Sequence, residues 1–252
     1  MLKAVVFDMD DTLLSINLSA FIALLARDES AMLARIGRKS PLAMFALYGS
    51  AMLELNNPGR SDADLSNREF FDDFVLRRCG VPLNDPVVRD AFEYYEREVL
   101  PGKNDAIVNA RPRRGAREAM EAVASRGLRT ALLTNPSFSE TCIRTRMAWG
   151  DMLDMPFEFV TSMENSFHCK PCADYYLENL ERMGLKPHEV LMVGNDPKRD
   201  FPAPDCGIQT AYVGAGTHPR ATWSGSMADF AASFDEIEER FLAREVEVRS
   251  PR

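Results

Sequence analysis

The sequence lacks long apolar runs and has few cysteines. No apolar segment approaches the roughly 18–20 residues of a transmembrane helix, and the run after Lys3 reaches Asp8 too soon for a signal peptide. The five cysteines are an odd, scattered set that does not resemble a disulfide framework. We therefore expect a cytoplasmic location, in a reducing compartment, and no membrane partner.

The chain also lacks an excess of basic residues. Its net charge of -8 argues against nucleic acid or an anionic membrane as the main partner. Zinc binding by Cys169 and Cys172 with His168 is disfavoured because no second pair of ligands accompanies them. The sequence GAGTHP from Gly214 lacks the third glycine of a dinucleotide-binding fingerprint. A length of 252 residues allows one large domain or two smaller ones.

Short apolar runs alternate with helix-like segments along most of the chain. This alternation predicts an α/β fold with a doubly wound, Rossmann-like parallel sheet. Ligands of such sheets bind beyond the carboxyl ends of the strands. We expect strands at 3–7, 128–133, 157–161, 190–193 and 208–213, and helices at 115–125, 138–149, 173–183, 202–206 and 227–246.

The stretch from residue 16 to 111 differs, because its apolar residues fall at helical spacing and it has no clear strand. We expect helices near 18–36, 41–57, 61–80 and 85–101, with Ser61 and Asp85 capping the last two. The sequence thus predicts a helical cap domain, 16–111, inserted into an α/β core made of 1–15 and 112–252. A helical subdomain that only covers the core is the alternative.

The first expected strand ends in three carboxylates, Asp8, Asp10 and Asp11. Like charges this close repel, and a buried carboxylate is costly unless a cation or hydrogen-bond donors compensate it. An EF-hand calcium loop is excluded, because Leu13 and Ser19 occupy the positions of its glycine and glutamate. A solvated acidic turn and a cation site remain as interpretations.

Polar residues also follow the later strands, each ordinary when taken alone. Thr134 and Asn135 follow one strand, and Lys170 precedes a helix. Another strand runs through Gly194 into Asn195, Asp196 and Asp200, whose oxygens are suited to Mg²⁺. In a parallel sheet these groups gather at one edge, which favours a single site over independent coincidence.

These four motifs, in this order, resemble those of the haloacid dehalogenase superfamily of phosphohydrolases. D-x-D-x-T corresponds to Asp8, Asp10 and Thr12, and the other motifs are Thr134, Lys170 and the acidic loop Gly194 to Asp200. The resemblance covers residues 1–15 and 112–215. It implies the phosphatase branch with a helical cap after the first motif, because the gap between Asn135 and Lys170 is too short for the larger cap at the second site.

The resemblance also implies roles for these residues. Asp8 would be the nucleophile that becomes an aspartyl-phosphate, and Asp10 the general acid and then the general base. Thr134, Asn135 and Lys170 would bind the phosphate, and Lys170 would also keep Asp8 anionic. Mg²⁺ would neutralise charge on Asp8 and the phosphate; its expected ligands are Asp8, Asp10, Asn195, Asp196 and Asp200.

One position departs from the family pattern. Asn195 stands where the family usually has aspartate, so we expect Asn195 and Asp196 to share metal binding, with Asp196 as the charged ligand and Asp200 further out.

The implied activity is hydrolysis of a small phosphorylated metabolite. A dehalogenase is disfavoured, because that branch lacks a carboxylate at the position of Asp10. A phosphomutase with the same chemistry and a non-catalytic binding module remain as alternatives.

Candidate anchors for an anionic substrate are Arg60, Arg68, Arg111, Arg113 and Arg114. Nothing in the sequence sets an oligomeric state.

Overall fold

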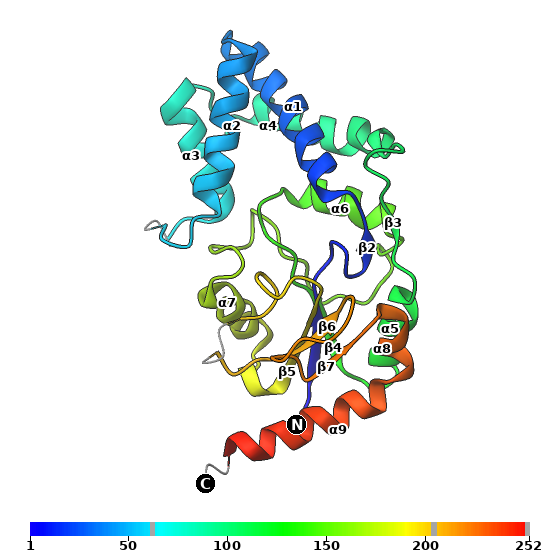
Figure 1. Cartoon of the computed structure of the whole chain (residues 1–252). Helices are drawn as coiled ribbons and strands as arrows, with labels where there is room; N and C mark the ends of the chain where they lie inside the picture. The colour runs from blue at the N-terminus through cyan, green and yellow to red at the C-terminus, as the bar shows by residue number, and fades with distance from the viewer. Residues whose placement is uncertain (61–63, 203–205, 250–252) are drawn as a thin grey trace.

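Five parallel strands form the centre of the molecule (Figure 1). The computed structural model describes residues 1–60, 64–202 and 206–249. β1 lies inside the sheet with parallel neighbours on both sides, and all four of its residues are buried. The strand order is β4 (Arg129–Leu132), β1 (Ala4–Phe7), β5 (Val190–Gly194), β6 (Gln209–Val213) and β7 (Trp223–Gly225).

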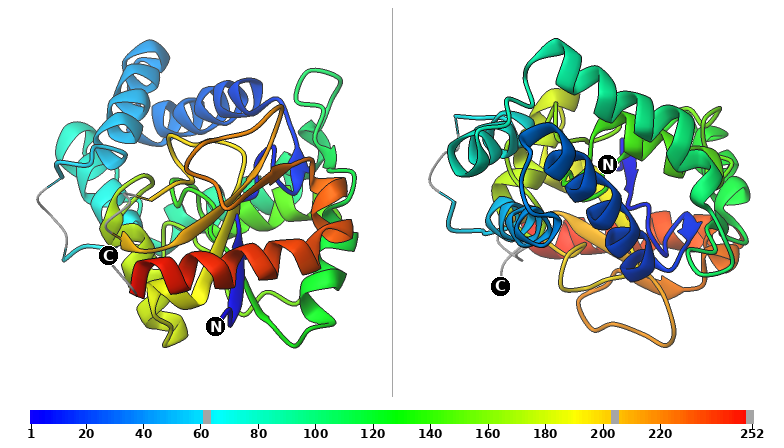
Figure 2. Two further views of the ribbon diagram at one scale, coloured as in Figure 1. Left: turned by 60° about the horizontal axis from the view of Figure 1, so that its bottom comes forward. Right: turned by 90° about the horizontal axis from the view of Figure 1, so that it is seen from above.

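Helices cover both faces of this sheet. Successive side chains of a strand point to opposite faces, so Val5 and Phe7 of β1 pack in one apolar cluster and Ala4 and Val6 in another. The first cluster is covered by α5 (Ala116–Ala124), α8 (Met227–Ala232) and α9 (Phe234–Arg249), and the second by α7 (Ala173–Met183) (Figures 1 and 2). The predicted doubly wound α/β architecture is confirmed.

The edges of the sheet differ from the prediction. Segment 157–161 forms only an isolated parallel bridge, between Leu132 and Val160, and no strand. The segment lies beside β4, and its side chains Phe157, Phe159 and Val160 are half-buried. Its apolar residues therefore cover the edge of the sheet without forming a strand. β7, which was not predicted, is the last strand at the opposite edge. The expected short helix at 202–206 falls largely on residues 203–205, which lie outside the described part of the chain.

A set of helices is inserted after β1 through a two-stranded ribbon. β2 (Leu14–Ser15) pairs antiparallel with β3 (Arg111–Pro112), so both connections between the insertion and the sheet run side by side. The inserted helices are α1 (Leu18–Gly37), α2 (Pro41–Leu55), α3 (Asn67–Cys79) and α4 (Pro86–Tyr94), followed by the π-helical turn η1 (Tyr95–Val99) and the 3₁₀ turn η2 (Leu100–Lys103).

The third inserted helix begins later than expected. Ser66, not Ser61, is its N-cap: the Ser66 hydroxyl accepts from the Glu69 N–H, and the Glu69 carboxylate accepts from the Ser66 N–H. Ser61 itself lies outside the described residues. Asp85 caps α4 as expected, accepting from the Val87 N–H.

The insertion sits over the sheet, and its helices supply most of a third apolar cluster, which Met163 and Cys169 complete. Leu33, Tyr48 and Phe71, from three of its helices, are buried together in this cluster. Figure 1 shows these helices above the carboxyl ends of the strands, on the side where ligands of such sheets bind. Within the described ranges, no helix is both long and apolar enough to cross a membrane. The boundaries at residues 15 and 112 stay a prediction, and β2 and β3 lie at them.

Candidate active site

β1 delivers Asp8 to the carboxyl edge of the sheet. The side chain is almost completely buried, and the Asp8 N–H continues the strand pairing by donating to the Val193 carbonyl at 2.9 Å. The chain then turns sharply, with Asp11 in the left-handed region at φ 55°, which aspartate tolerates better than most residues. This turn brings the Thr12 hydroxyl back to 3.1 Å from Asp8 Oδ2.

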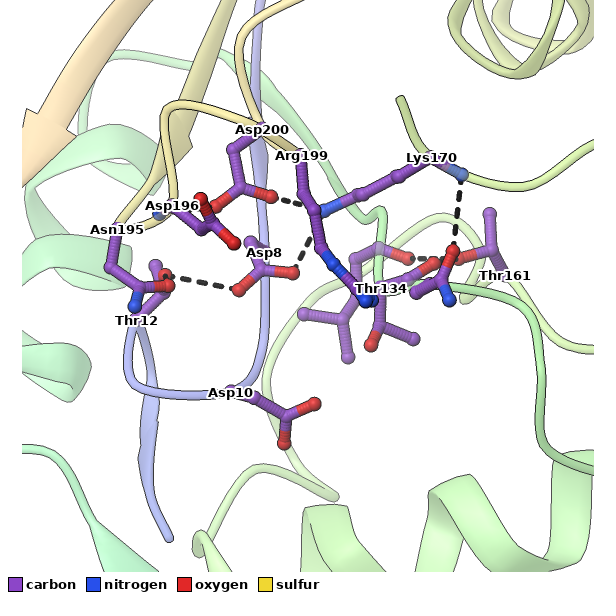
Figure 3. A network of polar contacts seen from close by, with 12 residues as sticks. Asp8, Asp10, Thr12, Thr134, Thr161, Lys170, Asn195, Asp196, Arg199 and Asp200 are labelled. Carbon is purple, nitrogen blue, oxygen red and sulfur yellow. Dashed lines mark hydrogen bonds and ion pairs between the residues drawn. The ribbon is translucent and has the colours of Figure 1, made fainter. Parts of the chain in front are cut away.

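Lys170 bridges two carboxylates at the centre of the site (Figure 3). Its Nζ donates to Asp8 Oδ1 at 2.8 Å and to Asp200 Oδ1 at 2.7 Å. All three side chains are buried, and they come from the end of β1, the segment before α7 and the loop after β5. The structure therefore brings together three of the residues that the sequence places at this edge.

Burial and mutual charge set the protonation of this trio. Burial raises the pKa of Asp200 to about 6, and the Asp8 charge adds to the rise while Lys170 opposes it. Burial likewise raises the pKa of Asp8, against the pull of the Lys170 ammonium. For Lys170, burial disfavours the ammonium form, but the charges of Asp200 and Asp8 outweigh it and raise its pKa. With both carboxylates ionised the trio carries one net negative charge, so a phosphate group there calls for a further cation.

The end of β4 is held in place by hydrogen bonds to its backbone. The Thr134 carbonyl accepts from the Thr161 hydroxyl and the Tyr175 hydroxyl, each at 2.7 Å. Thr134 is buried, and Figure 3 shows its side chain on the Lys170 side of Asp8. This position is compatible with the phosphate-binding role predicted for Thr134, which stays a prediction.

Asn135 links Lys170 to the helical insertion. Its Oδ1 accepts from the Lys170 backbone N–H at 3.0 Å, and its Nδ2 donates to Asn56 Oδ1 at 2.8 Å. Ser137 donates to the same Asn56 oxygen at 2.9 Å. The Asn135 amide is thus already engaged in positioning its neighbours, and phosphate binding by this residue stays a prediction.

Oxygen atoms suited to a hard cation lie on the other side of Asp8. Asn195 Oδ1 is 3.1 Å from the Thr12 hydroxyl that also contacts Asp8, and Figure 3 shows Asp196 between Asn195 and Asp200. The Asp196 N–H donates to Asp200 Oδ2 at 2.9 Å, which fixes this loop. Across the described ranges, no three His, Cys, Asp or Glu side chains are gathered as metal ligands. Carboxylate and amide oxygens from Asp8, Asp196 and Asn195 nevertheless form a donor set that fits Mg²⁺.

Asp8 and Asn195 contact the Thr12 hydroxyl, and two further predicted metal ligands also have side-chain partners. Asp200 is engaged by Lys170, and Asp10 forms an ion pair with Arg146. Figure 3 shows the Asp10 carboxylate turned away from Asp8. Metal binding therefore stays a prediction for Asp10 and Asp200, as it does for Asp8, Asn195 and Asp196. Of the predicted arginine anchors, Arg68 contacts Glu164 at 3.0 Å, and Arg113 lies 4.0 Å from Asp11.

Sequence reasoning missed Arg146, which lies in α6 (Glu140–Trp149). Its side chain is fully buried and its Nη2 donates to Asp10 Oδ1. An arginine ordinarily faces solvent, and the one signal in the sequence is its spacing: Arg146 falls four residues after Cys142 and three after Ile143, on the buried face of the helix. The contact itself appears only in the tertiary structure, which packs α6 against β2 and against the turns η1 and η2.

Comparison with known proteins identifies the family of this chain. The model of the haloacid dehalogenase-like hydrolase family matches residues 2–204. Haloacid dehalogenase-like hydrolase domain-containing protein 3 of Xenopus laevis is 27% identical over 64% of this chain and 63% of its own. A phosphoglycolate phosphatase of Nitrosospira multiformis is 29% identical over 77% of this chain and 75% of its own. The chain thus spans less than two thirds of the first relative's length.

A solved structure shares the fold. The structure of a HAD phosphatase from Thermococcus onnurineus superposes with a TM-score of 0.55 at 20% identity, over 94% of this chain and 98% of that one. Since the family model spans most of the sequence, including Asp8, Thr134, Lys170 and Asp200, the chain belongs to the haloacid dehalogenase-like hydrolases.

Proposed function

We propose that the protein is a Mg²⁺-dependent phosphomonoester hydrolase that acts through an aspartyl-phosphate on a small phosphorylated metabolite. The observation that carries the proposal is the buried Asp8–Lys170–Asp200 cluster, with Asp10 two residues beyond Asp8. The phosphatase named among the relatives supports the same reaction class.

In the first step Asp8 attacks phosphorus. A new bond forms between an Asp8 carboxylate oxygen and phosphorus, and the bond from phosphorus to the leaving oxygen breaks. Lys170 holds Asp8 Oδ1 in place, and its ammonium, with the Thr134 hydroxyl, stabilises charge on the equatorial phosphoryl oxygens. Asp10, which enters this step protonated, donates its proton to the leaving oxygen, and the carboxylate that results pairs with the Arg146 guanidinium.

In the second step water hydrolyses the aspartyl-phosphate. Asp10, now a carboxylate, accepts a proton from the water as the water oxygen bonds to phosphorus. The Asp8–phosphorus bond breaks, and Asp8 is regenerated with inorganic phosphate as product. Asp200 keeps Lys170 fixed through both steps, because it holds the same Nζ at 2.7 Å.

The proposed cation would be held by Asp8, Asn195 and Asp196. When bound, Mg²⁺ neutralises negative charge on the phosphate and on Asp8. We assign the charged contact to Asp196 and a neutral oxygen contact to Asn195. One Asp196 oxygen accepts from the Lys198 N–H at 2.9 Å, which orients this carboxylate.

The test is release of phosphate from p-nitrophenyl phosphate, with Mg²⁺ and with chelator. We expect turnover that needs Mg²⁺ and is abolished in Asp8→Asn. Asp11→Asn is the matched control, because Asp11 lies in the same turn, half-exposed, and asparagine tolerates its left-handed backbone. Equal activity in the wild type and Asp8→Asn would refute the proposal.

The phosphomutase alternative is tested in the same way with phosphorylated metabolites, phosphoglycolate among them. A mutase would return an isomeric phosphate ester in place of inorganic phosphate. Binding of Mg²⁺ without turnover of any ester would favour the non-catalytic module.

The cytoplasmic location remains part of this proposal, and the absence of disulfides at Cys79, Cys142, Cys169 and Cys172 supports it.

A further inference from the structure

Arg146 is the largest fully buried side chain among the described residues. Removing a guanidinium from water costs several kcal/mol unless partners compensate it. It lies in α6, between the sheet and the inserted helices (Figure 1). A buried charge in this position requires a compensating group.

That group is Asp10, together with two aromatic rings. Arg146 Nη2 donates to Asp10 Oδ1, while its Nε and Nη1 have no hydrogen-bond partner in the described part of the chain. The guanidinium carbon lies 4.9 Å from the ring centre of Phe21 and 5.0 Å from that of Phe138. The two rings pack edge to face with their centres 5.6 Å apart. The guanidinium of Arg146 thus contacts the rings of Phe21 and Phe138, and the Asp10 carboxylate is the one group to which it donates a hydrogen bond in the described part of the chain.

This contact determines where the Asp10 carboxylate lies. Asp10 is short and its side chain is 16% exposed, so the bond to Arg146 is a strong constraint on its rotation. In-line displacement puts the leaving oxygen on the far side of phosphorus from Asp8. A proton donor for that oxygen has to stand off from Asp8, as Asp10 does in Figure 3.

The geometry points to Arg146 as a positioning residue for Asp10, and to Phe21 of α1 as the part of the insertion that holds Arg146 in place. This inference rests on the proposed function and adds a residue to it. The helical insertion then contributes to catalysis, because its first helix supports the side chain that orients the proton donor.

The test measures how rate depends on the leaving group. We would compare kcat/KM for p-nitrophenyl phosphate, whose leaving group needs little protonation, with phenyl phosphate, whose leaving group is more basic. In Arg146→Gln we expect a loss of about 10- to 100-fold on phenyl phosphate and a much smaller loss on p-nitrophenyl phosphate. Arg146→Lys, which keeps the charge, should recover part of the loss on phenyl phosphate.

Two further variants separate this role from a structural one. Arg144→Gln, an exposed arginine of the same helix that pairs with Glu140, should leave both rates unchanged. Adding Arg146→Gln to Asp10→Asn should cause no further loss, because Arg146 acts through Asp10. Phe21→Leu should steepen the leaving-group dependence in the same direction, and it carries the test if Arg146→Gln does not fold.

The outcomes separate the inference from the proposed function. Equal losses on both esters, or losses that add in the double variant, would overturn the role of Arg146 while leaving the Asp8-dependent activity standing. Absence of Asp8-dependent turnover in the wild type would overturn both.

Discussion

Glu29 in α1 is a buried carboxyl whose ionisation should destabilise the protein. Burial and the neighbouring Glu96 raise the pKa of Glu29 to about 8, while Tyr48 and Arg68 work against the rise. Burial also raises the pKa of Glu96 to about 7. Glu96 accepts a hydrogen bond from the Ser139 hydroxyl at 2.6 Å, so the pair lies where the insertion meets the core.

The direction of the pH effect follows from the protonation of Glu29 in the folded and in the unfolded state. The pKa of Glu29 is raised on folding, so between about pH 4.5 and pH 8 the folded state holds a proton that the unfolded state releases. The stability of the folded state therefore falls as pH rises through this window. One pKa unit is worth ~1.4 kcal/mol. The rise of the Glu29 pKa from 4.5 to about 8 therefore corresponds to a loss of about 5 kcal/mol of unfolding free energy above pH 8, relative to low pH.

Glu29→Gln keeps the shape and removes the charge. Since Glu29 and Glu96 share the effect, we expect the variant to gain about 2–4 kcal/mol of unfolding free energy at pH 8.5, and to differ by about 1 kcal/mol or less at pH 5. The assay is urea denaturation at both pH values. Glu98→Gln, an exposed carboxylate of the same insertion, is the control and should show no such difference. An equal effect of Glu29→Gln at both pH values would refute the reasoning.

Three further predictions concern the site. Lys170→Met leaves Asp8 and Asp200 buried without their cation; we expect loss of turnover and about 3–5 kcal/mol of stability by urea denaturation, and unchanged stability would contradict the ion-pair account. Gly194→Ala would put a Cβ 2.4 Å from Asp200 Oδ2; the displaced carboxylate should lower kcat/KM by roughly 100-fold, and an unaltered rate would show that Asp200 need not stay in place. Asn56→Ala removes the oxygen shared by Asn135 and Ser137; we expect about 1–2 kcal/mol lower stability in the same denaturation assay, and no change would show that this link does not stabilise the fold.

Several parts of the fold and of the site follow from local pattern alone. The apolar run 4–7 forms β1 and delivers Asp8 to the sheet edge, as predicted. Lys170 and Asp200 were also predicted for this edge, because strand ends in a parallel sheet converge. The structure adds that they contact each other and Asp8 directly. Apolar patterns predict strands less reliably at the edges of the sheet. Segment 157–161 is only half-buried there, and β7 is too short to show an alternation of apolar and polar residues.

Local sequence patterns specify the set of chemical groups and the order in which strands present them, because period and strand ends are local properties. Which groups contact one another depends on tertiary packing. Arg146 and Glu29 have the side chains of ordinary surface residues, and their burial depends on how α6 and α1 pack against each other and against Asp10, Phe21 and Glu96. Such contacts join residues far apart in the chain, so no local pattern encodes them, and they set both the position of Asp10 and the charge buried beneath the insertion.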